Sequence, residues 1–150
     1  MPNELTCRDV AEYFLSLVDE DSGDTITNLK LQKLVYYAQG FNLALFNKPL
    51  FKEHIEAWQH GPVTPVLYNK YKIYESNPIP KPKRLDFTKF DSKTKSLLNV
   101  IFEEYGQFSA WKLRDMSHLT PPWIKGDKIL SKLITNEDLK SYFSTQIEDG

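Results

Sequence analysis

The sequence predicts a mainly α-helical fold: a single compact helical domain around a central apolar helix, with a small β element of one or two short strands. The first observation is the stretch Ile26–Phe46, which is apolar nearly all the way round a helix and carries two charged residues, Lys30 and Lys33. Such a helix is buried on more than one side. The second observation is that apolar residues elsewhere recur mostly at helical spacing, and only residues 54–61 alternate as a strand does.

The length and composition favour one globular domain. The 150 residues are 41% hydrophobic and 13% aromatic, enough for a core without disulfides or metal. We expect a single domain over residues 1–150, with its core at about 6–143 and a flexible tail at 144–150. No apolar run reaches the roughly 20 residues of a membrane span, and the N-terminus lacks a signal-peptide pattern. The expected location is therefore the cytoplasm, with no membrane partner.

The net charge of −1 gives no overall field that would attract nucleic acid or a membrane surface. The segment Lys70–Lys95 is locally basic, with eight basic and three acidic residues. It is either a solvated face around a loop or a contact for an acidic partner or a phosphate backbone. Cys7 is the only cysteine, which excludes an internal disulfide. We predict that it is a small buried hydrophobic residue, although a reactive thiol at a helix start is the alternative.

Capping residues and apolar spacing place the other elements in order. Helices are expected after Thr6, from Thr27 or Asn28, from Thr64, from Ser92 to Gly106, from Ser109 to about Ser117, and after Thr135. The expected strand is "HIEAWQHG", residues 54–61. The sequence "HLTPPW", residues 118–123, is expected to break the helix that precedes it.

The central helix carries apolar residues on two opposite faces. One face holds the core stripe Leu31, Leu34, Val35, Ala38, Phe41 and Leu45. The other face holds Leu29, Lys33, Tyr36, Tyr37, Gly40 and Leu43. Gly40 costs about 1 kcal/mol relative to alanine inside a helix, and the usual compensation is room for another chain segment to come close. We therefore expect the rest of the chain, or a partner, to cover both faces.

The sequence contains no recognisable catalytic, cofactor-binding or metal-binding motif. The histidines His54, His60 and His118 lack metal-ligand spacing, and no glycine-rich phosphate loop is present. A pair of Cys7 with His60 or His118 stays open, but nothing singles it out. His60 precedes a Gly-Pro turn and either hydrogen-bonds a nearby turn or takes part in chemistry. We expect no enzyme activity, no cofactor and no metal.

Three stretches together resemble a known family. They are "TNLKLQKLVYYAQGFNLALFNKPLF" at 27–51, "EAWQHGPVTPVLYNKY" at 56–71 and "FSAWKLRDMSHLTPPW" at 108–123. They are similar to the Panacea domain of bacterial antitoxins, a family with SocA-like and GepA-like phage-associated members. The resemblance runs from about Thr6 to Phe143, and the three motifs are specific in combination.

The resemblance implies a function as the antitoxin of a toxin–antitoxin system. The partner would be a toxin encoded nearby, one that commonly stops translation, and neutralisation would proceed by direct protein–protein binding. One alternative is a proteolytic adaptor that delivers the toxin to a ClpXP-type protease. A second is an enzyme that reverses the modification caused by the toxin. Nucleic acid is not expected as a partner, and a homo-oligomer stays open.

The matching motifs supply the candidate site residues. The predicted partner contacts are Lys33, Tyr36, Tyr37, Trp58, His60 and Tyr68. The residues predicted to shape the domain are Leu31, Leu34, Gly40, Gly61, Pro62, Val63 and Trp123.

Overall fold

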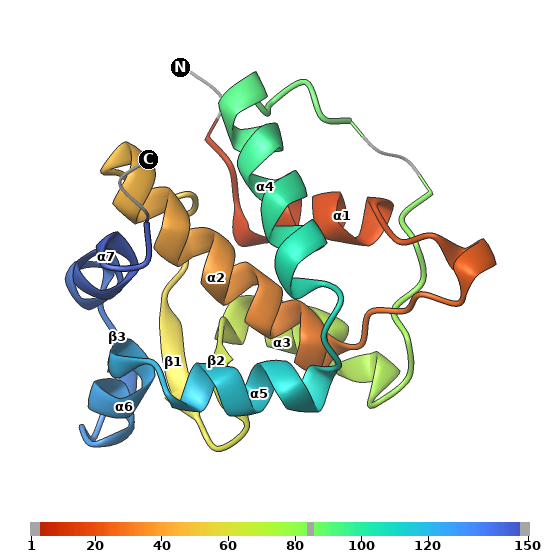
Figure 1. The fold of residues 1–150 in the computed structure, drawn as a ribbon. Helices are drawn as coiled ribbons and strands as arrows, with labels where there is room; N and C mark the ends of the chain where they lie inside the picture. The colour runs from red at the N-terminus through yellow and green to blue at the C-terminus, as the bar shows by residue number, and fades with distance from the viewer. Residues whose placement is uncertain (1–3, 84–85, 148–150) are drawn as a thin grey trace.

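The computed structural model describes residues 4–83 and 86–147, which form seven α-helices and one small sheet (Figure 1). The helices are α1 (Cys7–Ser16), α2 (Asn28–Phe46), α3 (Pro65–Tyr71), α4 (Ser92–Tyr105), α5 (Ala110–His118), α6 (Pro121–Asp127) and α7 (Asn136–Ser144). The strands are β1 (Ile55–Trp58), β2 (Gly61–Val63) and β3 (Leu133–Ile134), and two short 3₁₀ turns are η1 (Glu20–Ser22) and η2 (Lys72–Tyr74). The predicted mainly helical class is confirmed. Within the described residues, no helix is both long and apolar enough to cross a membrane.

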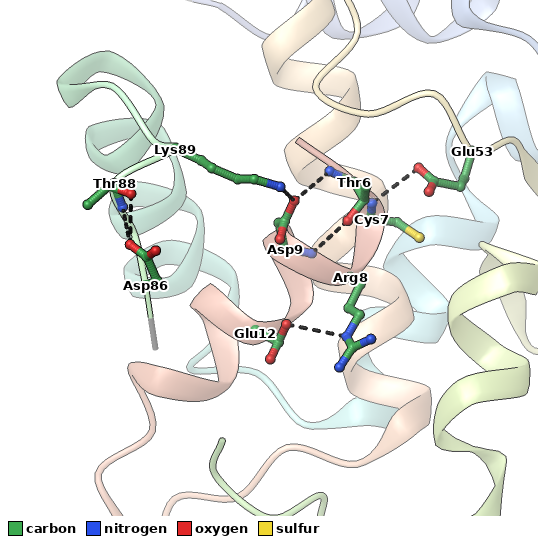
Figure 2. Close-up of polar contacts among 9 residues, drawn as sticks. All are labelled: Thr6, Cys7, Arg8, Asp9, Glu12, Glu53, Asp86, Thr88 and Lys89. Carbon is green, nitrogen blue, oxygen red and sulfur yellow. Dashed lines mark hydrogen bonds and ion pairs between the residues drawn. The ribbon is translucent and has the colours of Figure 1, made fainter. Parts of the chain in front are cut away.

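The chain enters α1 through a capping box at Thr6 (Figure 2). Thr6 Oγ1 accepts from the Asp9 backbone N–H at 3.2 Å, and Asp9 Oδ2 accepts from the Thr6 N–H at 2.9 Å. The Cys7 N–H donates to Glu53 Oε1 at 3.1 Å, which ties α1 to the loop before β1. The Cys7 side chain is buried, and this burial, together with the Glu53 charge, raises the pKa of its thiol to about 12. The prediction of a buried cysteine is confirmed.

Helix α2 lies at the centre of the molecule, as its two apolar faces predict (Figure 1). Thirteen of its 19 residues are buried, so both faces are covered over most of the helix. Leu45, expected in the core stripe, is instead 47% exposed near the C-terminal end. Five other helices pack against α2: α1, α3, α4, α5 and α7. At Gly40 the ring of Phe143 from α7 takes the place of a side chain, since a Cβ there would lie 2.2 Å from Phe143 Cδ2. The missing side chain thus lets α7 approach α2 closely.

The buried amides of α2 hold the loops around it. Gln39 Nε2 donates to the Phe51 carbonyl at 3.0 Å, and its Oε1 accepts from the Leu50 N–H at 2.6 Å. Gln32 Oε1 accepts from the Thr64 N–H at 2.8 Å, just before α3. Asn42 Nδ2 donates to the Lys48 carbonyl at 2.8 Å. The two glutamines satisfy backbone groups that would otherwise be buried without a partner, so the helix fixes several loops at once.

The small sheet has the order β2-β1-β3 and is antiparallel throughout. Ala57 pairs with Pro62 within the β1–β2 hairpin, and Ile55 pairs with Ile134 on the other side. The prediction allowed one or two strands, and the structure has three because the two-residue β3 adds to the edge of β1. A strand this short has no alternation that a sequence pattern could reveal.

The prediction that residues 118–123 only break a helix was incomplete. Helix α5 does end at His118, but α6 begins immediately afterwards with Pro121 and Pro122 in its first turn. Proline is tolerated there because the first helical N–H groups have no partner within the helix. The two prolines therefore start a helix in this sequence.

Candidate partner-binding site

Four of the predicted contact residues line one cavity. It has a volume of about 700 Å³ and lies among the β1–β2 hairpin, the N-terminal turns of α2 and α5, and the α3–η2 segment. Lys33, Trp58, His60 and Tyr68 all contribute to its lining. These residues are 35 positions apart at most in the sequence, and the hairpin folds back over α2 to bring them together.

Aromatic rings form the walls of this cavity. Trp58 and Tyr68 meet edge to face, with ring centroids 5.1 Å apart. Trp58 Nε1 donates to Glu56 Oε1 at 2.9 Å, which fixes the indole orientation. Across the mouth, the ring of exposed His60 meets Trp111 of α5 edge to face at 5.7 Å. Trp111 itself is 57% exposed. Partly exposed aromatic side chains of this kind dominate the binding energy of many protein interfaces.

Lys33 lies against this cavity from beneath the hairpin turn. Its side chain is fully buried, and its Nζ has no hydrogen-bond partner. The turn residue Gly61 has a φ of +109°, and a Cβ there would lie 2.5 Å from Lys33 Cε. Glycine is therefore needed twice, for the left-handed backbone and for the space that the lysine stem occupies. Burial, and the nearby Arg114 charge, lower the pKa of Lys33 to about 7.

The structure places Tyr36 and Tyr37 in the core, away from any surface that a partner could reach. Both are buried. The Tyr36 hydroxyl is 2.7 Å from Thr120 Oγ1, and the Tyr37 ring stacks on Tyr105 at 4.2 Å. Burial raises the pKa of both phenols. We therefore remove these two tyrosines from the proposed contact surface. Unlike the equally buried Lys33, neither lines the cavity, and α7 and the C-terminal end of α4 cover the face of α2 on which they lie.

The residues expected to shape the domain lie around the same hairpin and helix. Leu31 and Leu34 are fully buried on α2. Pro62 and Val63 are buried in β2. Trp123 Nε1 donates to the Trp58 carbonyl at 3.0 Å. Trp123 thus anchors α6 to the strand that carries the cavity wall.

Cys7, His54 and His118 lie on different elements and contact different neighbours. Cys7 is buried on α1 beside Glu53. His54 Nε2 lies 2.7 Å from Glu56 Oε2 at the surface. His118 stacks on Trp123 at 4.2 Å, and burial, with the Arg114 charge, lowers its pKa. Residues 4–83 and 86–147 bring together no group of three or more His, Cys, Asp or Glu side chains suited to a metal ion.

Trp111 is an aromatic residue of the cavity lining that the sequence did not predict as a contact. It lies in the motif "FSAWKLRDMSHLTPPW", which carries the family resemblance, but apolar spacing alone assigns a helical tryptophan to the core. The available signal was position: Trp111 follows the N-cap Ser109 by two residues. At this place in a helix that begins at the surface, the side chain is exposed.

Comparisons with known proteins agree with this picture. The family model described as "Antitoxin SocA-like, Panacea domain" matches residues 31–124, which is more than half of the chain. A stretch of 43 residues is 51% identical to "Antitoxin SocA" of Caulobacter vibrioides (strain NA1000 / CB15N), covering 29% of this chain and 23% of that protein. No solved structure shows a significant match. The matched range includes α2 from Leu31 onward, the hairpin, the α3–η2 segment and α5, and the chain belongs to the family of SocA-like antitoxins with a Panacea domain.

Proposed function

We propose that this chain is the antitoxin of a toxin–antitoxin system and that it neutralises a cognate toxin by direct protein–protein binding. The observation that carries the proposal is the family match over residues 31–124. The toxin would be the product of a neighbouring gene, acting on translation, and the complex would form in the cytoplasm.

The exposed aromatic cavity supports binding as the mechanism. An interface of standard size covers about 1,600 Å² and draws most of its energy from a few aromatic anchors in well-packed pockets. Trp58, Tyr68 and Trp111 supply such rings around one opening. Occlusion of a toxin surface needs no catalytic group in the antitoxin, and this agrees with the absence of a recognised catalytic motif in the sequence.

Co-expression with the adjacent gene product tests the proposal. We expect the chain to restore growth in cells that produce the toxin, and we expect the two proteins to co-purify as a stable complex. Protection should persist in a host that lacks ClpX, because masking does not depend on proteolysis. Loss of protection in that host alone would identify an adaptor, and toxicity unchanged in both hosts would contradict the antitoxin function.

His60→Ala separates binding from repair of toxin damage. A direct binder that loses one rim contact should lose protection only as far as it loses affinity for the toxin. Full affinity together with complete loss of protection would instead indicate that the imidazole takes part in chemistry on the modified target. The measurement pairs a titration of the purified toxin with the growth assay.

A further inference from the structure

The cavity described above has aromatic walls, two exposed charged residues of opposite sign, Lys72 and Glu75, and one buried cation, Lys33, in its lining. The Nζ of Lys33 is buried without a hydrogen-bond partner. A buried ammonium ordinarily has an acidic partner, because removal from water is costly. None of the ion pairs found among the described residues includes Lys33.

The contrast with the other buried polar residues of α2 makes this lysine exceptional. Gln32 Nε2 donates to Asn28 Oδ1 at 2.9 Å, and the Asn28 amide donates in turn to the Tyr68 carbonyl at 3.3 Å. Gln39 and Asn42 each bond a loop backbone. Every buried amide on this helix therefore has a partner, whereas the ammonium beside them has none.

Arg114, the charge that shifts the pKa of Lys33, is positive, so it supplies no counter-charge to the ammonium. Arg114 of α5 acts on Lys33 as a like charge and lowers its pKa. Arg114 forms an ion pair with the exposed Asp115, whose Oδ1 lies 3.0 Å from Arg114 Nη1. Glu75 is an exposed residue of the cavity rim, and it forms no ion pair with Lys33. The N-terminal turns of α2 and α5 also border the cavity, and their positive dipole ends favour a negative group.

From this arrangement we infer that the cavity receives an acidic side chain of the toxin, whose carboxylate pairs with the Lys33 ammonium when the β1–β2 turn at Gly61 that covers it moves aside, while neighbouring apolar toxin residues pack on Trp58, Tyr68 and Trp111. This inference rests on the proposed function and names the chemistry of the toxin surface. A single carboxylate matches the single buried lysine charge. The aromatic walls favour a polypeptide segment over a freely hydrated anion, because only the former carries apolar groups to cover them.

The Lys33→Met variant tests the inference directly. Methionine keeps the length and apolar stem of the side chain and removes the ammonium, so the fold should be retained. The control is Lys93→Met, an exposed lysine on α4 that borders a different surface depression. We expect calorimetric titration of the purified toxin to show at least about a 30-fold loss of affinity for Lys33→Met, as for a truncated charged contact. The control should stay within about twofold of wild type.

Replacing the toxin's surface Asp and Glu residues one at a time by Asn and Gln then identifies the partner group. One such replacement in the toxin should lower its affinity for the wild-type antitoxin by a similar factor. It should hardly change the affinity for Lys33→Met, because the two groups act as a pair. Circular dichroism establishes that each variant is folded. If Lys33→Met is unfolded, Lys33→Gln and Lys33→Leu take its place in the same titration.

The other possible results of the titration distinguish failure of this inference from failure of the proposed function. Equal affinity of folded Lys33→Met and wild type for the toxin would overturn the inference and leave the antitoxin function intact. The same result, with sodium acetate or phosphate protecting wild type but not the variant against heat, would assign the lysine to a small free anion instead. Failure of wild type itself to bind the toxin would overturn the proposed function, and the inference with it.

Discussion

At Gly40 the absence of a side chain determines how closely two helices pack. The Phe143 ring occupies the position next to the Gly40 Cα, and its Cδ2 and Cε2 would both lie within 2.3 Å of an added Cβ. A rigid aromatic ring on a packed helix cannot move aside without shifting α7. Steric demand at this residue therefore outweighs the intrinsic preference of helices for alanine.

We expect Gly40→Ala to lower the free energy of unfolding by about 1–3 kcal/mol. Overpacking costs this amount in well-packed cores, although alanine alone would gain about 1 kcal/mol in helix propensity. Urea denaturation provides the measurement. In the background of Phe143→Leu the same substitution should cost less, because the ring has gone. A more stable Gly40→Ala protein would show that α7 does not pack here.

Lys33 makes the stability of the free protein depend on pH. Its pKa is about 7 in the folded chain, against an ordinary value of 10.5. Between these values the unfolded chain binds more protons than the folded chain, so the free energy of unfolding rises with pH. We expect an increase of up to about 1.4 kcal/mol per pH unit from pH 7 to pH 9.

Lys33→Met should be more stable than wild type at pH 7 by about 1–4 kcal/mol, as is common when an apolar residue replaces a buried charge. Its stability should also lose the upward slope between pH 7 and pH 9. Denaturation curves at pH 7, 8 and 9 measure both effects. Parallel pH profiles for the two proteins would mean that Lys33 reaches solvent or an acidic group in solution.

At the scale of elements, α2 acts through its amides as much as through its apolar surface. The sequence identifies the helix from Thr27 to Phe46 and its two covered faces, because hydrophobic spacing and capping are local signals. It does not identify which segment Asn28, Gln32 and Gln39 hold, because those partners lie 11 to 40 positions away. The same limit explains why Tyr36 and Tyr37 were placed on the contact surface: α7, which covers them, begins 99 residues after Tyr37.

The Gln39→Ala substitution tests this role of α2. It leaves the Leu50 N–H and the Phe51 carbonyl buried without partners, and we expect a loss of about 2–4 kcal/mol in the free energy of unfolding. Gln107→Ala is the matched control, since Gln107 is exposed and bonds only the nearby Glu104 carbonyl at 2.8 Å. The control should change stability by less than about 0.5 kcal/mol. Similar losses in the free energy of unfolding for both variants would show that the buried Gln39 amide does not stabilise the loop more than an exposed amide does.

At the scale of the whole molecule, the helices pack around one core to which both halves of the chain contribute. The sequence predicted the fold class because α2 has no exposed face to place on a surface. It missed α6 and β3, since Pro121 and Pro122 act as a helix start and a two-residue strand has no period. For the site, it named Lys33, Trp58, His60 and Tyr68 from motif resemblance, and only the fold shows that they share a cavity with Trp111.

We predict that the chain unfolds as one domain over residues 1–150. A shared core implies a single cooperative transition, with tryptophan fluorescence and far-ultraviolet circular dichroism giving coincident curves in urea. The fluorescence reports on Trp58, Trp111 and Trp123 near the hairpin, whereas the dichroism reports on every helix. Separate midpoints for the two signals would divide the chain into independently stable parts.

The hydrogen bonds from α2 to its loops have a consequence for recognition. Gln32 accepts a hydrogen bond from the backbone where β2 passes into α3, and Asn28 donates one to the Tyr68 carbonyl of α3. Two walls of the cavity are therefore bonded to the same helix, α2. These two walls are thus ordered before a partner arrives, and binding spends little free energy on ordering them. Selection among candidate toxins should accordingly depend on how well each toxin surface fits these walls.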